Sequence, residues 1–274
     1  MNTLVQWLKD HKLINFGIWL IYAMLVILPH EWVGLKINTF FKSMPRQQYN
    51  EIILIGSLVL LSIVLTSIGK KLLAHTEKGL IFFFFALTIF FIYLTNTYLF
   101  VINIESVHYL QYAVAAILIF PMLNSYYATL FWATFMGFID ESYQYFILAP
   151  ERTDYFDIND IITNFLGVAF GLLILKTLGV EADKKDSQTL KTQVVLPALL
   201  LTLFMGILLA TNILSVGPSE DMYNIVRVPP PGFWSKVHPN VTYHVVQPLE
   251  GLIYMITLFG IYYFAFRSKL VEKS

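Results

Sequence analysis

The segment GFIDESYQYF, residues 137–146, places ionisable side chains inside an apolar run that covers residues 130–148. Asp140 and Gln144 are separated by one helical turn, and Glu141 lies beside that face. A carboxylate at the middle of a bilayer costs about 3 kcal/mol, and the C-terminal end of a helix is unfavourable for anions. Because adjacent carboxylates also repel each other, local stability does not explain the pair, which suggests a functional site.

Two further apolar runs place polar residues at helical spacing. Glu105, His108 and Tyr112 fall at positions i, i+3 and i+7, which share one face of a helix. Asp160 and Asn164 fall at i and i+4 in another run. Carboxylates and an imidazole suit general acid–base chemistry, and oxygen ligands suit hard divalent cations.

Structural alternatives exist for several of these residues. His108 alone would more often be a hydrogen-bonded interface histidine, and Asp157 is best explained as a helix cap. Gly167 and Gly171, spaced G-x-x-x-G, are most simply explained by close helix packing. Glu250 either joins the site or ends the loop before the last apolar run. An ion pair of Asp140 or Glu141 with Arg152 or His108 would be the structural explanation of the acidic pair.

Composition indicates a polytopic membrane protein. Hydrophobic residues make up 57% of the 274 residues and charged residues 13%, whereas soluble domains carry about 25% charged residues. The 18 basic and 18 acidic residues balance, so nothing indicates a nucleic-acid partner. The absence of cysteine excludes disulfides, thiol nucleophiles and thiolate metal sites. No motif predicts a cofactor; a divalent cation is compatible with the acidic residues, but no metal-binding motif specifies one.

The chain is expected to be all-α, with about eight transmembrane helices. A span needs about 20 mostly apolar residues. We take the first run as a retained span and not as a cleaved signal peptide. Only LNS separates the fourth and fifth runs, which predicts a tight antiparallel hairpin. The predicted runs are residues 13–28, 52–68, 79–102, 106–123, 126–148, 161–178, 194–214 and 249–266.

Basic residues place both termini on the cytoplasmic side, because lysine and arginine favour that side. If all eight runs span, twelve basic residues lie inside and six outside. The outside loop 29–50 mixes aromatics with lysine and fits a segment lying flat at the membrane interface. The inside residues are Lys9, Lys12, Lys70, Lys71, Lys78, Lys176, Lys184, Lys185, Lys191, Arg267, Lys269 and Lys273, and the outside ones are Lys36, Lys42, Arg46, Arg152, Arg227 and Lys236.

Three regions follow from this pattern. Residues 1–78 form a two-helix extension, 79–178 a four-helix core, and 179–274 a polar linker followed by a two-helix extension. The long external loop 215–247 belongs to the last region. Its aromatic residues and the strand-like alternation of VTYHVV predict an ordered cap over the outer face.

The polar ends of three runs converge on the external side in this topology. Residues 79–175 contain seven acidic residues and a single basic one, Arg152, all assigned to the outer half. We therefore expect an outward-facing acidic pocket, with Arg152 as a clamp for an anion or as an internal partner. The candidate ligand-binding residues are Glu105, His108, Tyr112, Asp140, Glu141, Gln144, Arg152, Asp160 and Asn164.

The joint pattern resembles the VanZ-like family over about residues 80–178. That family shows a histidine followed by aromatics, an acidic pair with a glutamine three residues on, an arginine after a short loop, and D-x-x-x-N-x-x-G-x-x-x-G. These features fall here on His108 and Tyr112, on Asp140, Glu141 and Gln144, on Arg152, and on Asp160, Asn164, Gly167 and Gly171.

The resemblance implies action at the outer face of the cytoplasmic membrane. Its namesake is linked to resistance to teicoplanin, so the expected partner is an envelope lipid, a lipid-linked precursor or a lipophilic glycopeptide. An alternative is an intramembrane enzyme, with Asp140 or Glu141 as base and His108 as acid–base partner or metal ligand. A proton-coupled transporter is a third hypothesis, but the acidic residues stay on one side and no polar path to the cytoplasm is visible. The oligomeric state stays open.

Overall fold

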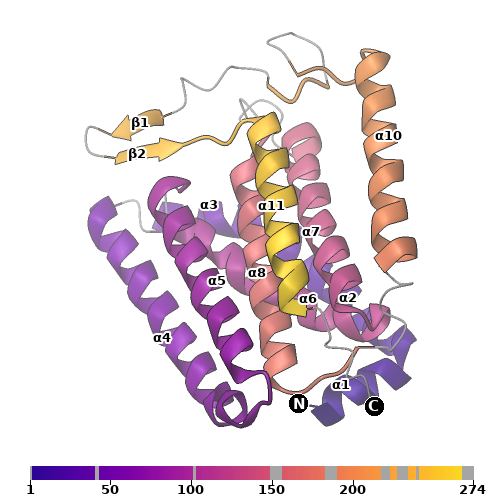
Figure 1. Cartoon of the computed structure of the whole chain (residues 1–274). Helices are drawn as coiled ribbons and strands as arrows, with labels where there is room; N and C mark the ends of the chain where they lie inside the picture. Colours follow the sequence, from indigo (N-terminus) through magenta and orange to yellow (C-terminus); the bar gives the residue numbers. More distant parts are fainter. Residues whose placement is uncertain are drawn as a thin grey trace.

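Long apolar helices form the bulk of the structure, a computed structural model, as the apolar runs predict (Figure 1). The structure describes residues 2–40, 43–100, 103–148, 156–182, 190–216, 223–226, 234–238 and 241–266. The α-helices are α1 (Asn2–Asp10), α2 (Lys12–Tyr22), α3 (His30–Phe40), α4 (Arg46–Ala74), α5 (Lys78–Tyr98), α6 (Val107–Leu123), α7 (Tyr126–Tyr143), α8 (Ile158–Thr177), α10 (Leu196–Ala210) and α11 (Pro248–Phe266). Short helical turns are η1 (Ala23–Ile27), η2 (Asn103–Ser106), η3 (Gln144–Leu148) and η4 (Lys191–Val195), and the strands are β1 (Trp234–His238) and β2 (Val241–His244).

Six helical segments in the described part of the chain are long and apolar enough to cross a membrane. They contain α2, α4, α5, α8, α10 and α11. The remaining two predicted runs also fall on helices, since α6 is a shorter apolar helix and α7 ends in the polar DESY stretch. The prediction of a mostly helical chain with helices long and apolar enough to span a membrane is therefore confirmed.

α8 is the central helix of the bundle, and α5, α6, α7 and α11 pack around it. Its residues are apolar on nearly every side, which is typical of a helix enclosed by others. Phe165, Leu166, Leu172 and Leu173 are fully buried there. In contrast, α10 stands at the edge of the bundle (Figure 1) and has no buried residue. Near its start, Trp132 of α7 donates its indole N–H to the Gln193 carbonyl at 2.9 Å.

Two glycines let α8 touch the backbone of α6. A Cβ at Gly167 would lie 2.7 Å from the carbonyl oxygen of Tyr109, and a Cβ at Gly171 would overlap the carbonyl oxygen of Ala113. The G-x-x-x-G spacing thus allows close helix packing, which is the structural explanation proposed for these two glycines from the sequence. This contact fixes how the first turns of α6 and α8 face each other.

The α6–α7 connection is the predicted tight hairpin. Asn124 ends α6 in the left-handed conformation at φ 50°, and Ser125 caps α7 by accepting a hydrogen bond from the Ala128 amide at 3.3 Å. The two helices therefore run antiparallel, which brings the beginning of α6 beside the end of α7.

A β-hairpin lies at the end of the bundle where α8 begins (Figure 1). β1 and β2 pair antiparallel, which confirms the strand expected within VTYHVV. Asn159 of α8 anchors the segment after β2, because its side chain donates to the carbonyls of Leu99 and His244 and accepts from the Val246 amide, each at 3.0 Å. We call this end of the bundle, where the β-hairpin of β1 and β2 lies, the hairpin end.

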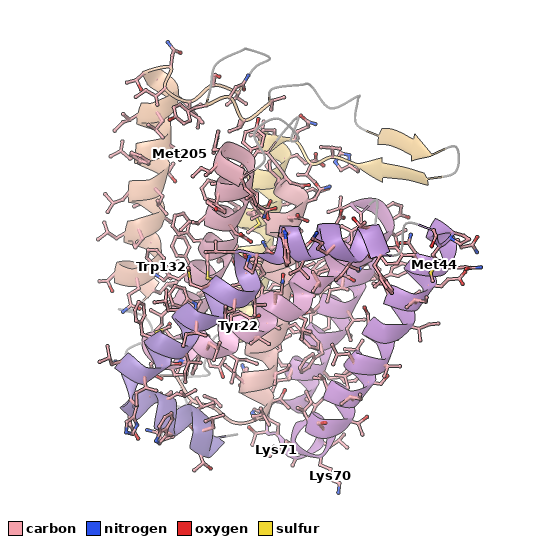
Figure 2. All side chains as sticks on the ribbon, turned by 180° about the vertical axis from the view of Figure 1, so that it is seen from behind. Tyr22, Met44, Lys70, Lys71, Trp132 and Met205 are labelled. Atoms are coloured by element: carbon pink, nitrogen blue, oxygen red, sulfur yellow. The ribbon has the colours of Figure 1, made fainter. Side chains whose placement is uncertain are left out.

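The opposite end of the bundle carries basic residues. Lys176 of α8 pairs with Glu77 at 2.9 Å and donates to the Ala265 carbonyl at 2.7 Å. Figure 2 shows Lys70 and Lys71 at this same end of α4. The same view shows α3 lying across the other helices between Tyr22 and Met44, an orientation expected of a segment that does not span.

The close approach of α6 and α8 makes Gly171 intolerant of a side chain. We expect Gly171→Ala to lower the free energy of unfolding by about 2 kcal/mol, because the added methyl forces the two backbones apart. Thermal unfolding of the purified protein in detergent measures this. Gly206→Ala in α10 is the matched control: nothing lies within 4 Å of its Cβ position, so its change should stay within about 1 kcal/mol. Equal midpoints for the two variants would contradict the packing argument.

Candidate functional site

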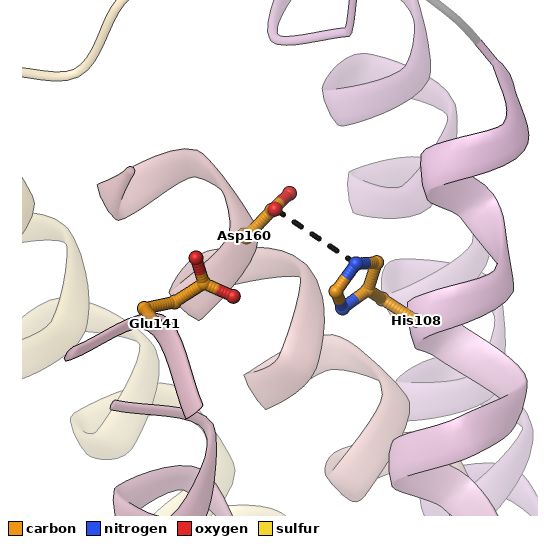
Figure 3. A group of neighbouring side chains, drawn as sticks. All are labelled: His108, Glu141 and Asp160. Carbon is orange, nitrogen blue, oxygen red and sulfur yellow. Dashed lines mark ion pairs between the residues drawn. The ribbon is translucent and has the colours of Figure 1, made fainter. Parts of the chain in front are cut away.

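The beginning of α6, the end of α7 and the beginning of α8 meet at the hairpin end. Each contributes polar side chains to one cluster, and Figure 3 shows His108, Glu141 and Asp160 directed toward one another from these three helices. We call His108, Tyr112, Asp140, Glu141, Gln144, Asp160 and Asn164 the polar cluster. All seven were predicted as ligand-binding residues, and the structure places them together, while their role stays a prediction.

His108 is the link between α6 and α8. Its side chain is buried, and its Nδ1 lies 2.9 Å from Oδ1 of Asn164. Because an amide oxygen only accepts, Nδ1 carries the proton and donates. The other ring nitrogen, Nε2, lies 3.8 Å from Oδ2 of Asp160, beyond the reach of a direct hydrogen bond.

Asn164 reaches His108 through space left by a glycine of α7. The Asn164 side chain is fully buried, and a Cβ on Gly137 would lie 2.7 Å from its Nδ2. Any larger residue at position 137 would therefore displace the amide. The sequence pattern placed Gly137 one turn before Asp140, and the structure supplies the reason for a glycine there.

The two adjacent carboxylates of α7 have different partners. Asp140 accepts a hydrogen bond from the Tyr112 hydroxyl at 3.2 Å, and Glu141 accepts one from the Gln144 side-chain amide at 3.2 Å. Both carboxylates are buried. The ring of Tyr112 lies parallel to that of His108, with an angle of 8° between the planes.

The carboxylates of α7 are more enclosed than that of Asp160, and the outward-facing acidic pocket stays a prediction. Only 2% of Asp140 and 4% of Glu141 are exposed. Asp160 is more accessible, with 15% of its side chain exposed against 4% for His108.

A metal ion could be held by three of these residues. One atom from each of His108, Glu141 and Asp160 lies within 4.8 Å of the other two. The three residues come from three helices, so backbone packing holds the donors near one another.

Other predicted residues are placed differently. Glu105 lies half-buried in η2, one turn before His108, and Arg152 lies outside the described residues. Asp157 is the N-cap of α8, as expected, and accepts from the Asn159 amide at 2.9 Å. Glu250 lies in the first turn of α11, where it accepts a hydrogen bond from His244 at 2.8 Å and one from the Gln247 amide at 3.2 Å.

Asn159 is a structural residue that sequence reasoning missed. It stands next to Asp160, but its side chain turns to the backbone of the segment after β2 and to the end of α5. No spacing rule links it to those distant carbonyls, so only the fold reveals this role.

Asp157 gives the hairpin end a pH dependence. Burial and, next, the nearby Asp160 raise the pKa of this carboxyl to about 7, against the lowering effect of two backbone hydrogen bonds. Since a carboxyl in the unfolded chain titrates near 4, the folded state binds the proton more tightly. The stability from Asp157 is therefore present in full below pH 4 and is lost as the pH rises toward 7 and beyond.

We expect Asp157→Asn to unfold at a higher temperature than the wild type at pH 8, with the difference shrinking toward pH 4. Asparagine keeps the helix cap and removes the titrating group. Thermal midpoints measured from pH 4 to pH 8 check this, with Asp10→Asn at an exposed carboxylate of α1 as the control for loss of one charge. A difference in thermal midpoint between Asp157→Asn and the wild type that grows toward low pH would contradict the prediction.

Comparison of this chain with protein-family models, with curated proteins and with solved structures finds no match. The geometry of the polar cluster is therefore the structural observation from which a function can be proposed.

Proposed function

We propose that this chain is a multi-pass protein of the bacterial cytoplasmic membrane, with about eight spanning helices, both termini inside and the hairpin end outside. The position of Lys70, Lys71 and Lys176 at the end opposite the hairpin supports this orientation, because basic residues favour the cytoplasmic side.

We further propose that the protein acts at the outer face of that membrane, in the manner suggested by the VanZ resemblance. Its partner is an envelope lipid, a lipid-linked precursor or a lipophilic glycopeptide, and its action protects against teicoplanin. The observation on which this rests is the buried polar cluster where α6, α7 and α8 meet.

The energetics of burial support a functional cluster. Hydrogen bonds from Tyr112 and Gln144 offset part of the cost of burying Asp140 and Glu141. Even a well-formed buried ion pair is often no more stable than apolar residues of the same volume. Two adjacent buried carboxylates therefore add nothing to stability that apolar side chains could not supply, and ionisable residues inside membranes usually serve function.

Asp160 is the residue through which a ligand would approach. It is the more exposed partner of the His108–Asp160 pair and begins α8 beside the hairpin end. A cationic or hydrogen-bonding head group would meet this carboxylate first, with Glu141 and His108 behind it. Arg152, which follows α7 in sequence, is the expected partner of an anionic group.

An intramembrane enzyme is the second candidate, favoured by the arrangement of His108. Asn164 fixes the ring through Nδ1 and leaves Nε2 facing Asp160. An imidazole oriented by one polar group, with its second nitrogen 3.8 Å from a carboxylate oxygen, is suited to general acid–base catalysis once a substrate lies between them. Turnover of a lipid-linked substrate, lost in His108→Gln, would favour this candidate over a binding protein.

The decisive experiment measures glycopeptide susceptibility. We expect expression of the wild type in a teicoplanin-sensitive bacterium to raise the inhibitory concentration of teicoplanin, with little change for vancomycin. The double variant Asp140→Asn/Glu141→Gln should return it to the level of the empty vector, because the partner loses both buried carboxylates.

The control variant is Glu51→Gln, at an exposed carboxylate of α4 that pairs with Gln47 outside the polar cluster. It should protect as the wild type does, at equal membrane levels. Protection by the double variant would show that the function does not require the carboxylates of Asp140 and Glu141. No protection by the wild type would rule out the VanZ-type function.

A further inference from the structure

We propose that His108, Glu141 and Asp160 bind one divalent transition-metal ion inside the helix bundle. The three donor atoms lie within 4.8 Å of one another and come from α6, α7 and α8 (Figure 3). The inference goes beyond the proposed function and does not depend on it, because metal binding can be measured on the purified protein without any ligand.

The distances fit ligands of a shared ion better than they fit direct bonds. His108 Nε2 and Asp160 Oδ2 are 3.8 Å apart, which exceeds a hydrogen bond. Nitrogen and carboxylate oxygen bind zinc at about 2.1 Å in a tetrahedral arrangement, so two ligands of one ion lie about 3.4 Å apart. A small movement of the side chains brings all three donors into that range.

The tautomer of His108 is the one that a metal ligand requires. With Asn164 Oδ1 as the acceptor of the Nδ1 proton at 2.9 Å, Nε2 is the nitrogen that would bind the ion. Metal-bound histidines generally donate their other ring N–H to a carbonyl or carboxylate in this way. Asn164 is fully buried, and Gly137 provides its space, so the ring orientation is built into the helix packing.

The charge of the site favours an ion of charge +2. With both carboxylates ionised and the imidazole neutral, the three ligands carry two negative charges, one on the buried Glu141 and one on the partly exposed Asp160. A divalent cation neutralises them and removes much of the cost of their burial. This accounts for two acidic side chains meeting between apolar helices.

The donor set indicates the class of ion. An imidazole nitrogen favours zinc, iron and nickel over magnesium and calcium, and carboxylates also suit manganese. The chain contains no cysteine, so sites built on thiolates are excluded. Three protein ligands leave room for a water or a ligand oxygen, as in metal sites that perform chemistry, and the partly exposed Asp160 marks the open side.

Cobalt titration of the chelator-treated, detergent-purified full chain tests the site. We expect the wild type to bind one Co²⁺, seen by its visible absorption, and to release it to Zn²⁺. His108→Gln and Glu141→Gln remove a ligand each and should weaken binding by about 100-fold or more. Asn164→Ala keeps all three ligands and should weaken it by about 10- to 100-fold through loss of the ring orientation.

Two variants outside the site serve as matched controls. His11→Gln changes an exposed histidine of the turn after α1, and Glu51→Gln changes an exposed carboxylate of α4. Both should bind Co²⁺ as the wild type does. Should the ligand variants fail to fold, X-ray absorption of the zinc-loaded wild type replaces them, with one imidazole and oxygen ligands expected in the first shell.

Either of two results would overturn the inference: no binding by the wild type at micromolar Co²⁺ or Zn²⁺, or equal binding by wild type and Glu141→Gln. The teicoplanin measurement is separate. Metal binding without protection against teicoplanin would support the metal site and reject the proposed function. Protection without metal binding would support the proposed function and reject the metal site.

Discussion

The contact between the backbones of α6 and α8 determines most of what the hairpin end can do. Gly167 and Gly171 let the two helices approach until a Cβ would meet carbonyl oxygens of α6. One turn further toward the hairpin end, that spacing lets Asn164 hydrogen-bond to His108 and sets Asp160 beside the same ring. Since neither helix can rotate or slide without a backbone clash, His108, Asn164 and Asp160 form a rigid unit onto which α7 adds Glu141.

Much of this arrangement could be predicted from the sequence because it follows from periodicity. Apolar runs gave the helices, the LNS connection gave the α6–α7 hairpin, and i, i+4 spacing put Asp160 and Asn164 on one face. Three polar helix faces at the same end of a bundle lie close together, so the residues that form the polar cluster could also be predicted.

The parts that could not be predicted depend on side-chain direction and on contacts between distant segments. Spacing cannot say that the Asn164 amide turns to His108, or that Asn159, five positions earlier, turns instead to the segment after β2. Periodicity also cannot give the exposed fraction of each carboxylate, because enclosure depends on how closely α7 and α8 approach at Gly137. The structure encloses Asp140 and Glu141 and leaves Asp160 at the margin.

The isolated position of α10 has a consequence for how the protein is assembled in the membrane. None of its residues is buried, so packing in the bundle contributes little to its stability, and transfer of its apolar side chains into lipid would contribute most of it. The packing of α5, α6 and α7 on α8 can therefore form before α10 is synthesised, whereas α11, which follows α10 in the chain, joins the bundle after it. After α10 the chain is back at the hairpin end, where the amide of Phe156, just before α8, donates to the carbonyl of Ile225 at 3.0 Å.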